Sequence, residues 1–486
     1  IINFSMYKSG FNTVFSSYRL RNICSIFSNK DNNFYNVFLS KVSQLNMSSS
    51  PSPYALAALK TKGIEKSVWV EFIQLALEVK PLNLGQGFPD FAAPDSIRKA
   101  LAECCTDDQN VLFNQYTRGF GHPRLVTALS KLYSQILKRE IDPLQEVFVT
   151  AGAYEALFVT INGLVNPGDE VIIIEPFFDC YEPQVKLAGG TPIFVPLRPT
   201  KTEGQISSSD WKLDPQELSK AFSSRTKAII VNTPNNPLGK VFSLEELTLI
   251  ADLCKKHNSI AIMDEVYEWM TYDGVEHIRM ANLPGMWERS ITIGSAGKTF
   301  SVTGWKIGWA IGPKELLAGP KVVHQHSVYT CTTPTQEAVA RGFEIELERF
   351  GTTDCYFKSL PLELTDKRNK IVKILSDAGL NPIIPEGGYF ILADVRNLMS
   401  KIDVGGDPSE AKDFRFVKWL SRNRKLQGIP PSAFYSAPHK SIGRRLHSLL
   451  FYKSIESAPS GMQDDNLEKA GEILAKLKAD LEAGKV

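Results

Sequence analysis

Two residues far apart in the chain have side chains that together could carry amine chemistry. Lys298 follows the small residues Ala296 and Gly297, and Asp264 follows a short apolar run. A lysine that forms a Schiff base must be unprotonated part of the time. Since a free lysine titrates near ~10.4, its surroundings must favour the neutral form. A buried carboxylate could keep the nitrogen of a pyridine ring protonated, so that the ring absorbs carbanion charge. The pair predicts a pyridoxal phosphate site.

Neither residue supports that prediction alone, because an aspartate that ends a strand is more often a cap and a lysine after glycine is more often solvated. Three further residues could contact the ring. Asn236 lies in a Pro- and Gly-rich turn after the apolar run 228–231, and its amide could bond the ring hydroxyl. Tyr267 could donate to the same oxygen, or be a half-buried aromatic with its hydroxyl at the surface. Phe178 could stack on the ring, although two adjacent phenylalanines are usually core residues.

A phosphate group needs hydrogen-bond donors, and the chain offers them after the apolar run 147–150. That run predicts a strand, followed by a tight turn at Gly152 and the start of a helix. Free backbone amides at a helix start can hold an anion. Ser295 and Lys306 would add a hydroxyl and a positive charge. Without the other residues, this turn would indicate only a helix start.

Short apolar runs at 171–174, 228–231 and 260–263 alternate with helical patterns and predict buried strands. Ser243 and Glu246 have the spacing of a capping box that opens a helix. This pattern predicts an α/β fold in which helices cover a mostly parallel sheet. Ligands of such sheets bind at the carboxyl ends of the strands, where Asn236, Asp264 and Lys298 fall.

The chain resembles the fold type I aminotransferases, and within them the kynurenine aminotransferases, also called glutamine transaminase K or cysteine conjugate β-lyase. The resemblance runs from about Gly63 to His439. It is most specific in the strings 83–90, 114–116, 175–181, 232–240 and 295–298.

This resemblance implies a large domain with a seven-stranded sheet, at 91–350, and a smaller α/β domain formed by 51–90 and 351–486. It implies that Lys298 is the Schiff-base lysine and that Asp264 meets the pyridine nitrogen. The other expected cofactor contacts are Asn236 and Tyr267 at the ring oxygen, Phe178 on the ring face, and Ala153, Tyr154, Ser295 and Lys306 at the phosphate.

The resemblance also implies a homodimer, in which Tyr116 reaches the phosphate of the neighbouring subunit and Tyr329 is an aromatic residue offered to the partner. Gly87, Trp69 and Asn236 are expected at the substrate, and so is Tyr329, which falls where the family often has an aromatic residue from the partner subunit. The reaction would be a ping-pong transamination between an amino acid and a 2-oxo acid, with elimination from the β-carbon as a side reaction. Kynurenine, glutamine, methionine, phenylalanine and cysteine conjugates fit an apolar pocket with a few polar anchors.

One departure concerns the arginine that grips the substrate carboxylate in this family, because an ungapped match places Ser448 there. A serine cannot replace a fork of charged donors. A shifted reading frame across 443–450 would restore the missing strand and its arginine, and Arg444 or Arg445 could otherwise substitute. If Ser448 is genuine, losing the contact would cost roughly 2 to 5 kcal/mol. The alternative reading is then a cofactor-binding but catalytically impaired scaffold.

Composition agrees with this picture. The 486 residues are 43% hydrophobic and 22% charged, enough for a large core and at least two domains. A net charge of +2 gives no sign of a nucleic-acid or membrane surface, and no apolar run is long enough for a spanning helix. Seven cysteines, an odd number without a C-x-x-C pair, indicate reduced thiols, and we expect no metal site.

The first 46 residues are basic, with Asp31 as the single acid. This composition is typical of a mitochondrial transit peptide. Because residue 1 is Ile, translated leader sequence is an equal alternative, with a start at Met6 or Met47. The sequence therefore predicts a removable segment at 1–50 and a mitochondrial or cytoplasmic enzyme.

Overall fold

The computed structural model describes residues 57–65, 67–89, 91–441 and 465–486. Residues up to Lys62 and residues from Gly63 onward are separate units. In the first unit, the described residues include one turn of 3-10 helix, η1 (Leu59–Thr61). The predicted leader at 1–50, Ser448, Arg444 and Arg445 lie outside the described residues. Among the residues that are described, no helix is both long and apolar enough to cross a membrane.

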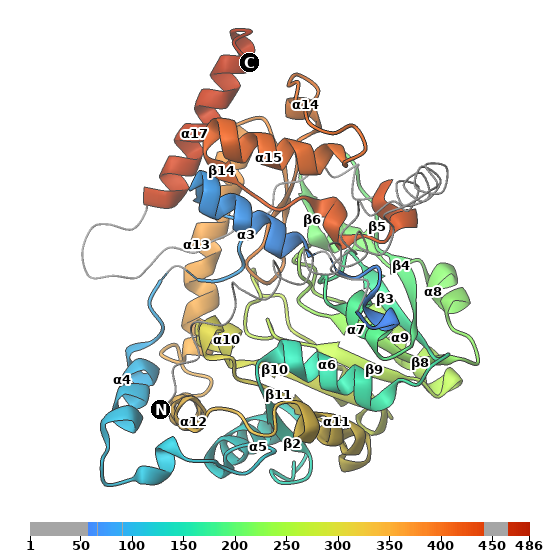
Figure 1. The fold of residues 1–486 in the computed structure, drawn as a ribbon, viewed down its shortest axis with the longest axis vertical. Coiled ribbons are helices and arrows are strands. Elements are labelled where there is room, and N and C mark those ends of the chain that lie inside the picture. Colours follow the sequence, from blue (N-terminus) through green and yellow to red (C-terminus); the bar gives the residue numbers. More distant parts are fainter. Residues whose placement is uncertain (1–56, 66, 90, 442–464) are drawn as a thin grey trace, which may run out of the picture. The chain divides into compact units, whose positions relative to one another are not determined.

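The second unit is built on a seven-stranded sheet (Figure 1). The strand β11 runs antiparallel to both of its neighbours, and the other contacts between neighbouring strands are parallel. The predicted mostly parallel sheet is therefore confirmed, as are the four predicted strands at 147–150, 171–174, 228–231 and 260–263. In spatial order the strands are β2 (Val147–Thr150), β11 (Gly308–Ile311), β10 (Ser290–Ser295), β9 (Ile260–Asp264), β8 (Thr226–Asn232), β3 (Glu170–Glu175) and β4 (Thr191–Pro196).

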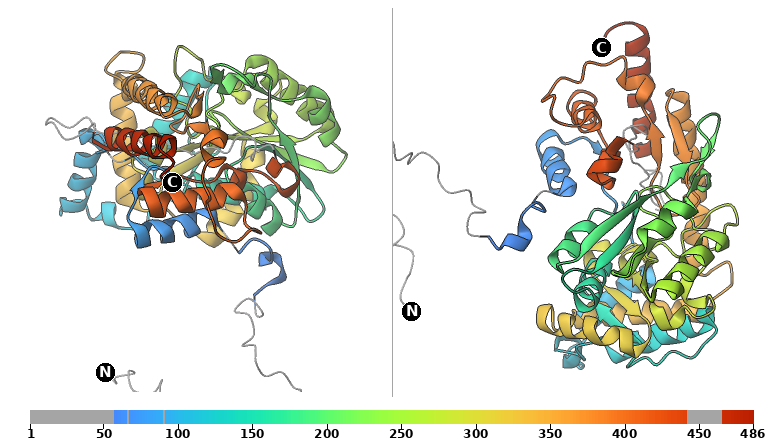
Figure 2. Two further views of the ribbon diagram at one scale, coloured as in Figure 1. Left: turned by 90° about the horizontal axis from the view of Figure 1, so that it is seen from above. Right: turned by 90° about the vertical axis from the view of Figure 1, so that its right-hand side faces the viewer.

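Helices cover both faces of this sheet (Figures 1 and 2). Successive strand residues point to opposite faces. Ile229 and Ala261 pack in one core cluster with α8 (Pro215–Ala221) and α9 (Leu244–His257). Ile230 and Ile262 pack in another with α6 (Ala153–Leu164), α7 (Tyr181–Leu187) and α11 (Lys314–Ser327). Each fully buried isoleucine stabilises the sheet by about 1.5 to 3 kcal/mol.

Two predicted helix starts are confirmed. Ser243 accepts a hydrogen bond from the backbone of Glu246 at 3.3 Å, and the Glu246 carboxylate accepts one from the backbone of Ser243 at 3.1 Å. This reciprocal box satisfies two amide donors at the start of α9. Helix α6 begins directly after Gly152, so its first free amides face the end of β2.

The remaining helices and strands flank the sheet. Helices α4 (Asp95–Thr106), α5 (Pro123–Leu137) and α12 (Thr333–Glu348) share a third core cluster with β2 and β11. Other helices are α3 (Val68–Val79), α10 (Ala296–Thr299), α13 (Tyr356–Asp377), α14 (Arg396–Met399), α15 (Lys412–Arg424) and α17 (Asp465–Glu482). The short strands are β1 (Leu82–Asn83), β5 (Arg198–Pro199), β6 (Ile206–Ser207), β7 (Trp211–Lys212), β12 (Asn381–Ile384), β13 (Leu392–Asp394) and β14 (Leu426–Gln427).

The two flanks of the predicted large domain meet, because β1 pairs in parallel with β14. The side chain of Gln427 also donates to the carbonyl of Phe72 at 3.0 Å. One apolar cluster runs without a break from α3 and α15 to β8 and α9. The division into two domains at residues 90 and 350 therefore stays a prediction.

Candidate active site

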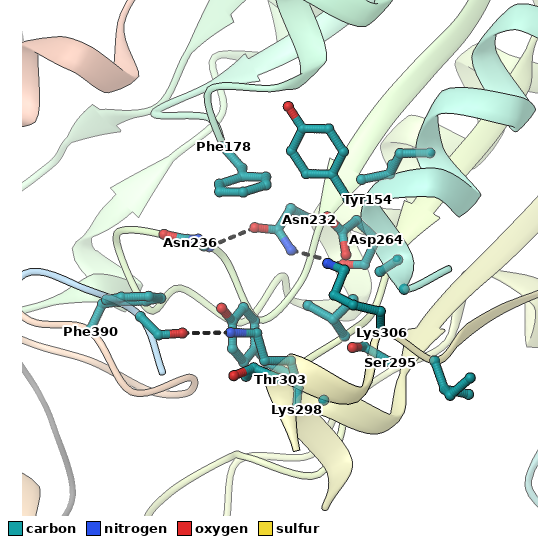
Figure 3. A pocket seen from close by; sticks show the side chains of 18 of the residues that line it. Tyr154, Phe178, Asn232, Asn236, Asp264, Ser295, Lys298, Thr303, Lys306 and Phe390 are labelled. Carbon is teal, nitrogen blue, oxygen red and sulfur yellow. Dashed lines mark hydrogen bonds between the residues drawn. The ribbon is translucent and has the colours of Figure 1, made fainter. Parts of the chain in front are cut away.

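A cavity of about 280 Å³ lies where β8, β9 and β10 end (Figure 3). The last residues of these strands, Asn232, Asp264 and Ser295, all line it. Segments far apart in sequence therefore meet at one edge of the sheet, as predicted. The predicted residues that line this cavity are Lys298, Asp264, Tyr267, Asn236, Phe178, Ala153, Tyr154, Ser295, Lys306, Gly87 and Trp69.

Asp264 is buried at the end of β9. Its Oδ2 accepts a hydrogen bond from the hydroxyl of Tyr181 at 2.5 Å. Its Oδ1 has no hydrogen-bond partner among the described residues. Burial raises the pKa of this carboxyl to about 6, although the bond from Tyr181 acts in the opposite direction. Asp264 is thus an acceptor that a donor in the cavity would stabilise.

Lys298 lies on α10, the single helical turn that follows β10. Its Nζ donates to the carbonyl of Gly87 at 2.9 Å and also to the hydroxyl of Tyr389. Burial lowers the pKa of Lys298 to about 7, and the positive charge of Lys306 lowers it further while Asp264 opposes the shift. A large share of this amine is neutral near pH 7, which is what Schiff-base chemistry requires.

The small size of Gly297 has a packing reason besides leaving room in the cavity. A Cβ at this position would lie 2.9 Å from the Cα of Thr303. Thr303 begins η6 (Thr303–Trp305), against which α10 packs. Glycine at 297 therefore allows the turn that carries Lys298 to lie against η6.

Asn236 is held at the cavity by Asn232. The backbone amide of Asn236 donates to Oδ1 of Asn232 at 2.6 Å, and Nδ2 of Asn232 donates to the carbonyl of Asp264 at 2.9 Å. The dashed lines that begin at Asn232 in Figure 3 mark these two bonds. Tyr267 is 2% exposed and lines the cavity. The alternative that placed its hydroxyl at the protein surface is therefore wrong.

A cradle of donors lies at the start of α6. Gly152 has φ +78°, a conformation that side chains rarely adopt, and the turn leads directly into the free amides of α6. A Cβ at 152 would lie 3.2 Å from Nζ of Lys306, so glycine also admits that ammonium group. Ser295 lines the same end of the cavity. The amides, the hydroxyl and the ammonium group together suit a phosphate.

The aromatic residues predicted for this site divide into two groups. Trp69 and Phe178 line the cavity with their ring centres 6.4 Å apart, and the indole of Trp69 donates to Asp179 at 2.8 Å. Tyr116 and Tyr329 are not among its lining residues and are 84% and 56% exposed. Their ring centres lie 6.0 Å apart in an edge-on contact. Their predicted role concerns a neighbouring subunit and stays a prediction.

Sequence reasoning missed three residues of the site. Asn232 carried a usable signal, because it ends a strand in register with Asp264. Tyr181 stands at the end of a string already singled out, but nothing local indicated that its hydroxyl meets Asp264. Tyr389 comes from a distant turn, and its contact with Lys298 depends on long-range folding that no local pattern encodes.

Metal ligation and disulfides have no support among the residues that the structure describes. In that part of the chain, no group of three or more His, Cys, Asp or Glu side chains is arranged to hold a metal ion. The described cysteines are free thiols, as predicted: Cys104, Cys105, Cys180, Cys254, Cys331 and Cys355.

Comparison with known proteins decides the family. Residues 79–435 match the family described as aminotransferase class I and II. The chain belongs to this family. It is 51% identical to kynurenine–oxoglutarate transaminase 3 of Rattus norvegicus, over 90% of this chain and 94% of that protein. It is also 51% identical to kynurenine–oxoglutarate transaminase 1 of Homo sapiens, over 85% of this chain and 98% of that protein.

Solved structures agree with the fold. The crystal structure of Bna3p from Saccharomyces cerevisiae, described as a putative kynurenine aminotransferase, aligns with a TM-score of 0.77 at 35% identity. It covers 86% of this chain and 97% of that one. An aspartate aminotransferase of Thermus thermophilus aligns with a TM-score of 0.72 at 26% identity, over 86% of this chain and 99% of that one. The chain is a fold type I aminotransferase, and proteins of this family and fold use pyridoxal phosphate.

The cavity residues fit that cofactor. The pyridine nitrogen of pyridoxal phosphate, when protonated, is a donor of the kind that Oδ1 of Asp264 lacks among the described residues. The start of α6 and Lys306 also line the cavity and suit the phosphate. Lys298 lines the same cavity, and burial lowers its pKa.

Proposed function

We propose that this chain is a pyridoxal phosphate-dependent aminotransferase that moves an amino group from kynurenine, glutamine or another large amino acid to a 2-oxo acid. The observation that carries the proposal is the pairing, in one cavity, of a lysine whose pKa is lowered to about 7 with a buried carboxylate whose Oδ1 has no partner in the described chain. If Lys298 and Asp264 had only a structural role, we would expect them to form an ion pair with each other or to be exposed to water.

Several of the cavity residues would hold the cofactor. Lys298 would bond to its aldehyde carbon and Asp264 would face its ring nitrogen. Asn236 and Tyr267 would meet the ring oxygen, while Phe178 would stack on the ring. The phosphate contacts would come from Ala153, Tyr154, Ser295 and Lys306.

When bound, pyridoxal phosphate supplies an aldehyde that captures the nitrogen of the amino acid and a ring that withdraws electrons from its α-carbon. Lys298 would then be free to move the proton between that α-carbon and the cofactor, since its lowered pKa suits a base near neutral pH. Asp264, as an ionised acid, would keep the ring nitrogen protonated.

The side chain of the donor would lie against the aromatic wall formed by Trp69 and Phe178. Apolar aromatic walls favour large, flat or thioether side chains, so methionine, phenylalanine and cysteine conjugates join kynurenine and glutamine as candidates. Donors with a leaving group on the β-carbon would also undergo elimination. The relatives named as kynurenine–oxoglutarate transaminases support this choice of donors.

The test is a panel of amino donors and 2-oxo acids with purified protein, with the keto acid product identified by mass spectrometry. Conversion of kynurenine or glutamine to its keto acid, with amino transfer to the acceptor, would support the proposal. Release of carbon dioxide or ring formation without amino transfer would overturn it. A parallel panel with Ser448→Arg tests the carboxylate contact, and equal affinity of both proteins for donors would mean that position 448 has no part in it.

We further propose a homodimer in which Tyr116 completes the phosphate site of the neighbouring subunit and Tyr329 meets the partner. The high exposure of both rings supports a surface that another subunit covers. The basic composition of the first 46 residues supports a mitochondrial enzyme, and a start at Met47 would give a cytoplasmic one.

A further inference from the structure

The amine of Lys298 is held by two hydrogen-bond acceptors in this fold. Nζ donates to the carbonyl of Gly87 at 2.9 Å and to the hydroxyl of Tyr389, and that hydroxyl donates in turn to the same carbonyl at 2.8 Å. The three polar groups form a closed triangle. Nζ also lies 4.9 Å from the ring centre of Tyr389.

From this triangle we propose that Tyr389 is a further catalytic residue, which with the Gly87 carbonyl docks the Lys298 amine whenever the amine is not bonded to the cofactor. The inference rests on the proposed function of Lys298. A neutral amine has two N–H donors and one lone pair, and the two bonds of the dock use both donors. The lone pair then remains free to accept a proton or to attack a carbon atom in the cavity.

The hydrogen-bonding capacity of the Tyr389 phenol fits its proposed role as an acceptor for the Lys298 amine. A phenol has one hydrogen to donate and oxygen lone pairs that accept. Its hydrogen is directed to the Gly87 carbonyl, so its oxygen faces the amine as an acceptor. Burial raises the pKa of Tyr389 above its ordinary value, so the phenol keeps its proton at neutral pH.

Gly87 is required for the close approach. A Cβ at position 87 would lie 2.6 Å from Cζ of Phe390, so any side chain there would push the carbonyl or the aromatic ring away. The two groups that bind the amine are therefore Gly87, near the start of the second unit, and Tyr389, in its C-terminal part. Both lie next to Lys298 on α10.

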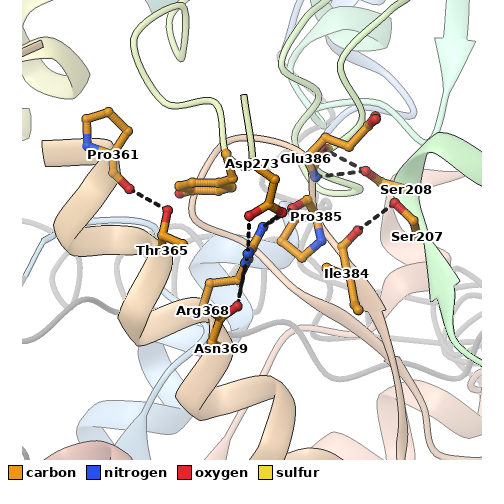
Figure 4. Close-up of polar contacts among 12 residues, drawn as sticks. Ser207, Ser208, Asp273, Pro361, Thr365, Arg368, Asn369, Ile384, Pro385 and Glu386 are labelled. Carbon is orange, nitrogen blue, oxygen red and sulfur yellow. Dashed lines mark hydrogen bonds and ion pairs between the residues drawn. The ribbon is translucent and has the colours of Figure 1, made fainter. Parts of the chain in front are cut away.

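The turn that carries Tyr389 is firmly held. Arg368 donates to the carbonyl of Pro385 at 3.3 Å and forms a two-pronged pair with Asp273 at 2.6 and 2.9 Å (Figure 4). The amide of Glu386 donates to the hydroxyl of Ser208 at 3.0 Å. These bonds fix the chain just before Tyr389.

Bonds to a second segment fix the chain directly before the phenol as well. The amide of Gly388 donates to the carbonyl of Met270 at 2.9 Å, and the hydroxyl of Tyr272 donates to the carbonyl of Gly388. A phenol that is held rigidly can fix the position of a flexible lysine side chain. The other charged or titratable groups that act on Lys298 are Asp264 and Lys306, with the ring of Tyr267 5.5 Å from its Nζ.

The test compares Tyr389→Phe with Tyr435→Phe. Both replacements remove one buried phenolic hydroxyl, but the hydroxyl of Tyr435 has no hydrogen-bond partner in the described part of the chain. The first measurement uses cofactor-free protein and follows the rate at which pyridoxal phosphate attaches, by absorbance, across a range of pH. The second follows a single half-reaction with an amino donor in the loaded enzyme.

We expect Tyr389→Phe to move the pH midpoint of attachment downward, because the charged amine loses an acceptor. We expect the half-reaction to slow about 10- to 100-fold with KM nearly unchanged. Tyr435→Phe should match the wild type in both. Replacement of Tyr389 by 3-fluorotyrosine, whose oxygen is a weaker acceptor, keeps the ring in place and should give an intermediate effect.

If Tyr389→Phe and the fluorinated protein both behave like the wild type while attachment proceeds normally, the dock is overturned and the role of Lys298 still stands. A wild-type protein that attaches no cofactor at Lys298 would overturn the proposed function instead. A change in KM alone, with an unchanged pH midpoint, would make Tyr389 a structural residue and would also overturn the dock.

Discussion

The central residues of the site have pKa values displaced in opposite directions by the same cause. Burial lowers the pKa of Lys298 to about 7 and raises that of Asp264 to about 6, because a low-dielectric environment disfavours both charged forms. With these pKa values, the amine and the carboxyl both titrate near pH 6 to 7, and each is partly uncharged in that range. A site of this kind is prepared to receive a group that restores the charge of the acid and bonds to the base.

The first prediction concerns the pH at which Lys298 reacts. Attachment of an aldehyde requires the neutral amine, so its rate should rise with pH and level off above about pH 7. Pyridoxal, which lacks the phosphate, allows the test to include Lys306→Met. Removing that positive charge should raise the midpoint. A midpoint near pH 10 in the wild-type protein would contradict the burial of this amine.

The second prediction concerns the stability of the cofactor-free protein. The pKa of Asp264 is about 6 in the folded state against 3.8 for the free group, so the folded protein binds more protons between these values. The free energy of unfolding should therefore fall as pH rises from about 4 to 6, and the loss should be complete above pH 6. Asp264→Asn removes this loss and should stabilise the cofactor-free protein at pH 7.5 by up to about 3 kcal/mol.

Urea unfolding at pH 4 and pH 7.5 measures this effect. The two proteins should differ little at pH 4, where the carboxyl is almost fully protonated in the folded state and about half protonated in the unfolded state. In the presence of pyridoxal phosphate the order should reverse, because only the acid can hold a protonated ring nitrogen. A variant that is equally destabilised at both pH values would show that the carboxylate is well satisfied without a ligand.

At the scale of elements, the turn between β2 and α6 is fixed by a partly buried acid. The carboxylate of Glu155 accepts from the amide of Ala151 and lies 2.7 Å from Nδ1 of His324. The other ring nitrogen of His324 lies 3.0 Å from the carbonyl of Gly119, which can only accept. Through these bonds, Glu155 on α6 connects the turn at Ala151 to His324 on α11. We call this set of contacts the brace of the turn.

The third prediction follows from this brace. Glu155→Gln should weaken the affinity for pyridoxal phosphate about tenfold, or about 1.4 kcal/mol, because the turn that presents the phosphate donors loses a charged acceptor. The affinity for pyridoxal should change little, since it has no phosphate. Glu182→Gln, which removes one half of a surface pair with Lys186 on α7, is the matched control. Equal losses for both ligands would contradict the role of the brace.

Local patterns predicted the elements well because the residues that decide them are neighbours in sequence. The runs 171–174, 228–231 and 260–263 are strands, and the Ser243 box opens α9, since apolar periodicity and capping are local signals. The carboxyl ends of parallel strands meet at one edge, so Asp264 and Asn236 could be placed together. Tyr389 could not, because its position depends on contacts with Met270, Tyr272 and Arg368 that only the folded chain brings together.

At the scale of the whole molecule, the exposed pair of Tyr116 and Tyr329 leads to the fourth prediction. If Tyr116 completes the neighbouring phosphate site, Tyr116→Ala and Lys298→Ala subunits should each be nearly inactive alone. Mixed dimers would contain one intact site, formed by Lys298 of one subunit and Tyr116 of its partner. Random mixing in equal amounts should restore about a quarter of the wild-type activity.

Sedimentation and activity after mixing measure this complementation. The result depends on exchange between subunits, which labelled subunits can monitor. Full activity of Tyr116→Ala alone, or no recovery in mixtures that contain mixed dimers, would contradict the shared site.

The most direct test of the central claim is borohydride reduction of the enzyme loaded with pyridoxal phosphate, followed by peptide mapping. Reduction makes the bond between aldehyde and amine permanent, so the labelled residue identifies the anchor. We expect the label on the peptide that contains Lys298, and no label in Lys298→Ala. A label on another lysine, or an unmodified Lys298 in an active enzyme, would contradict the account.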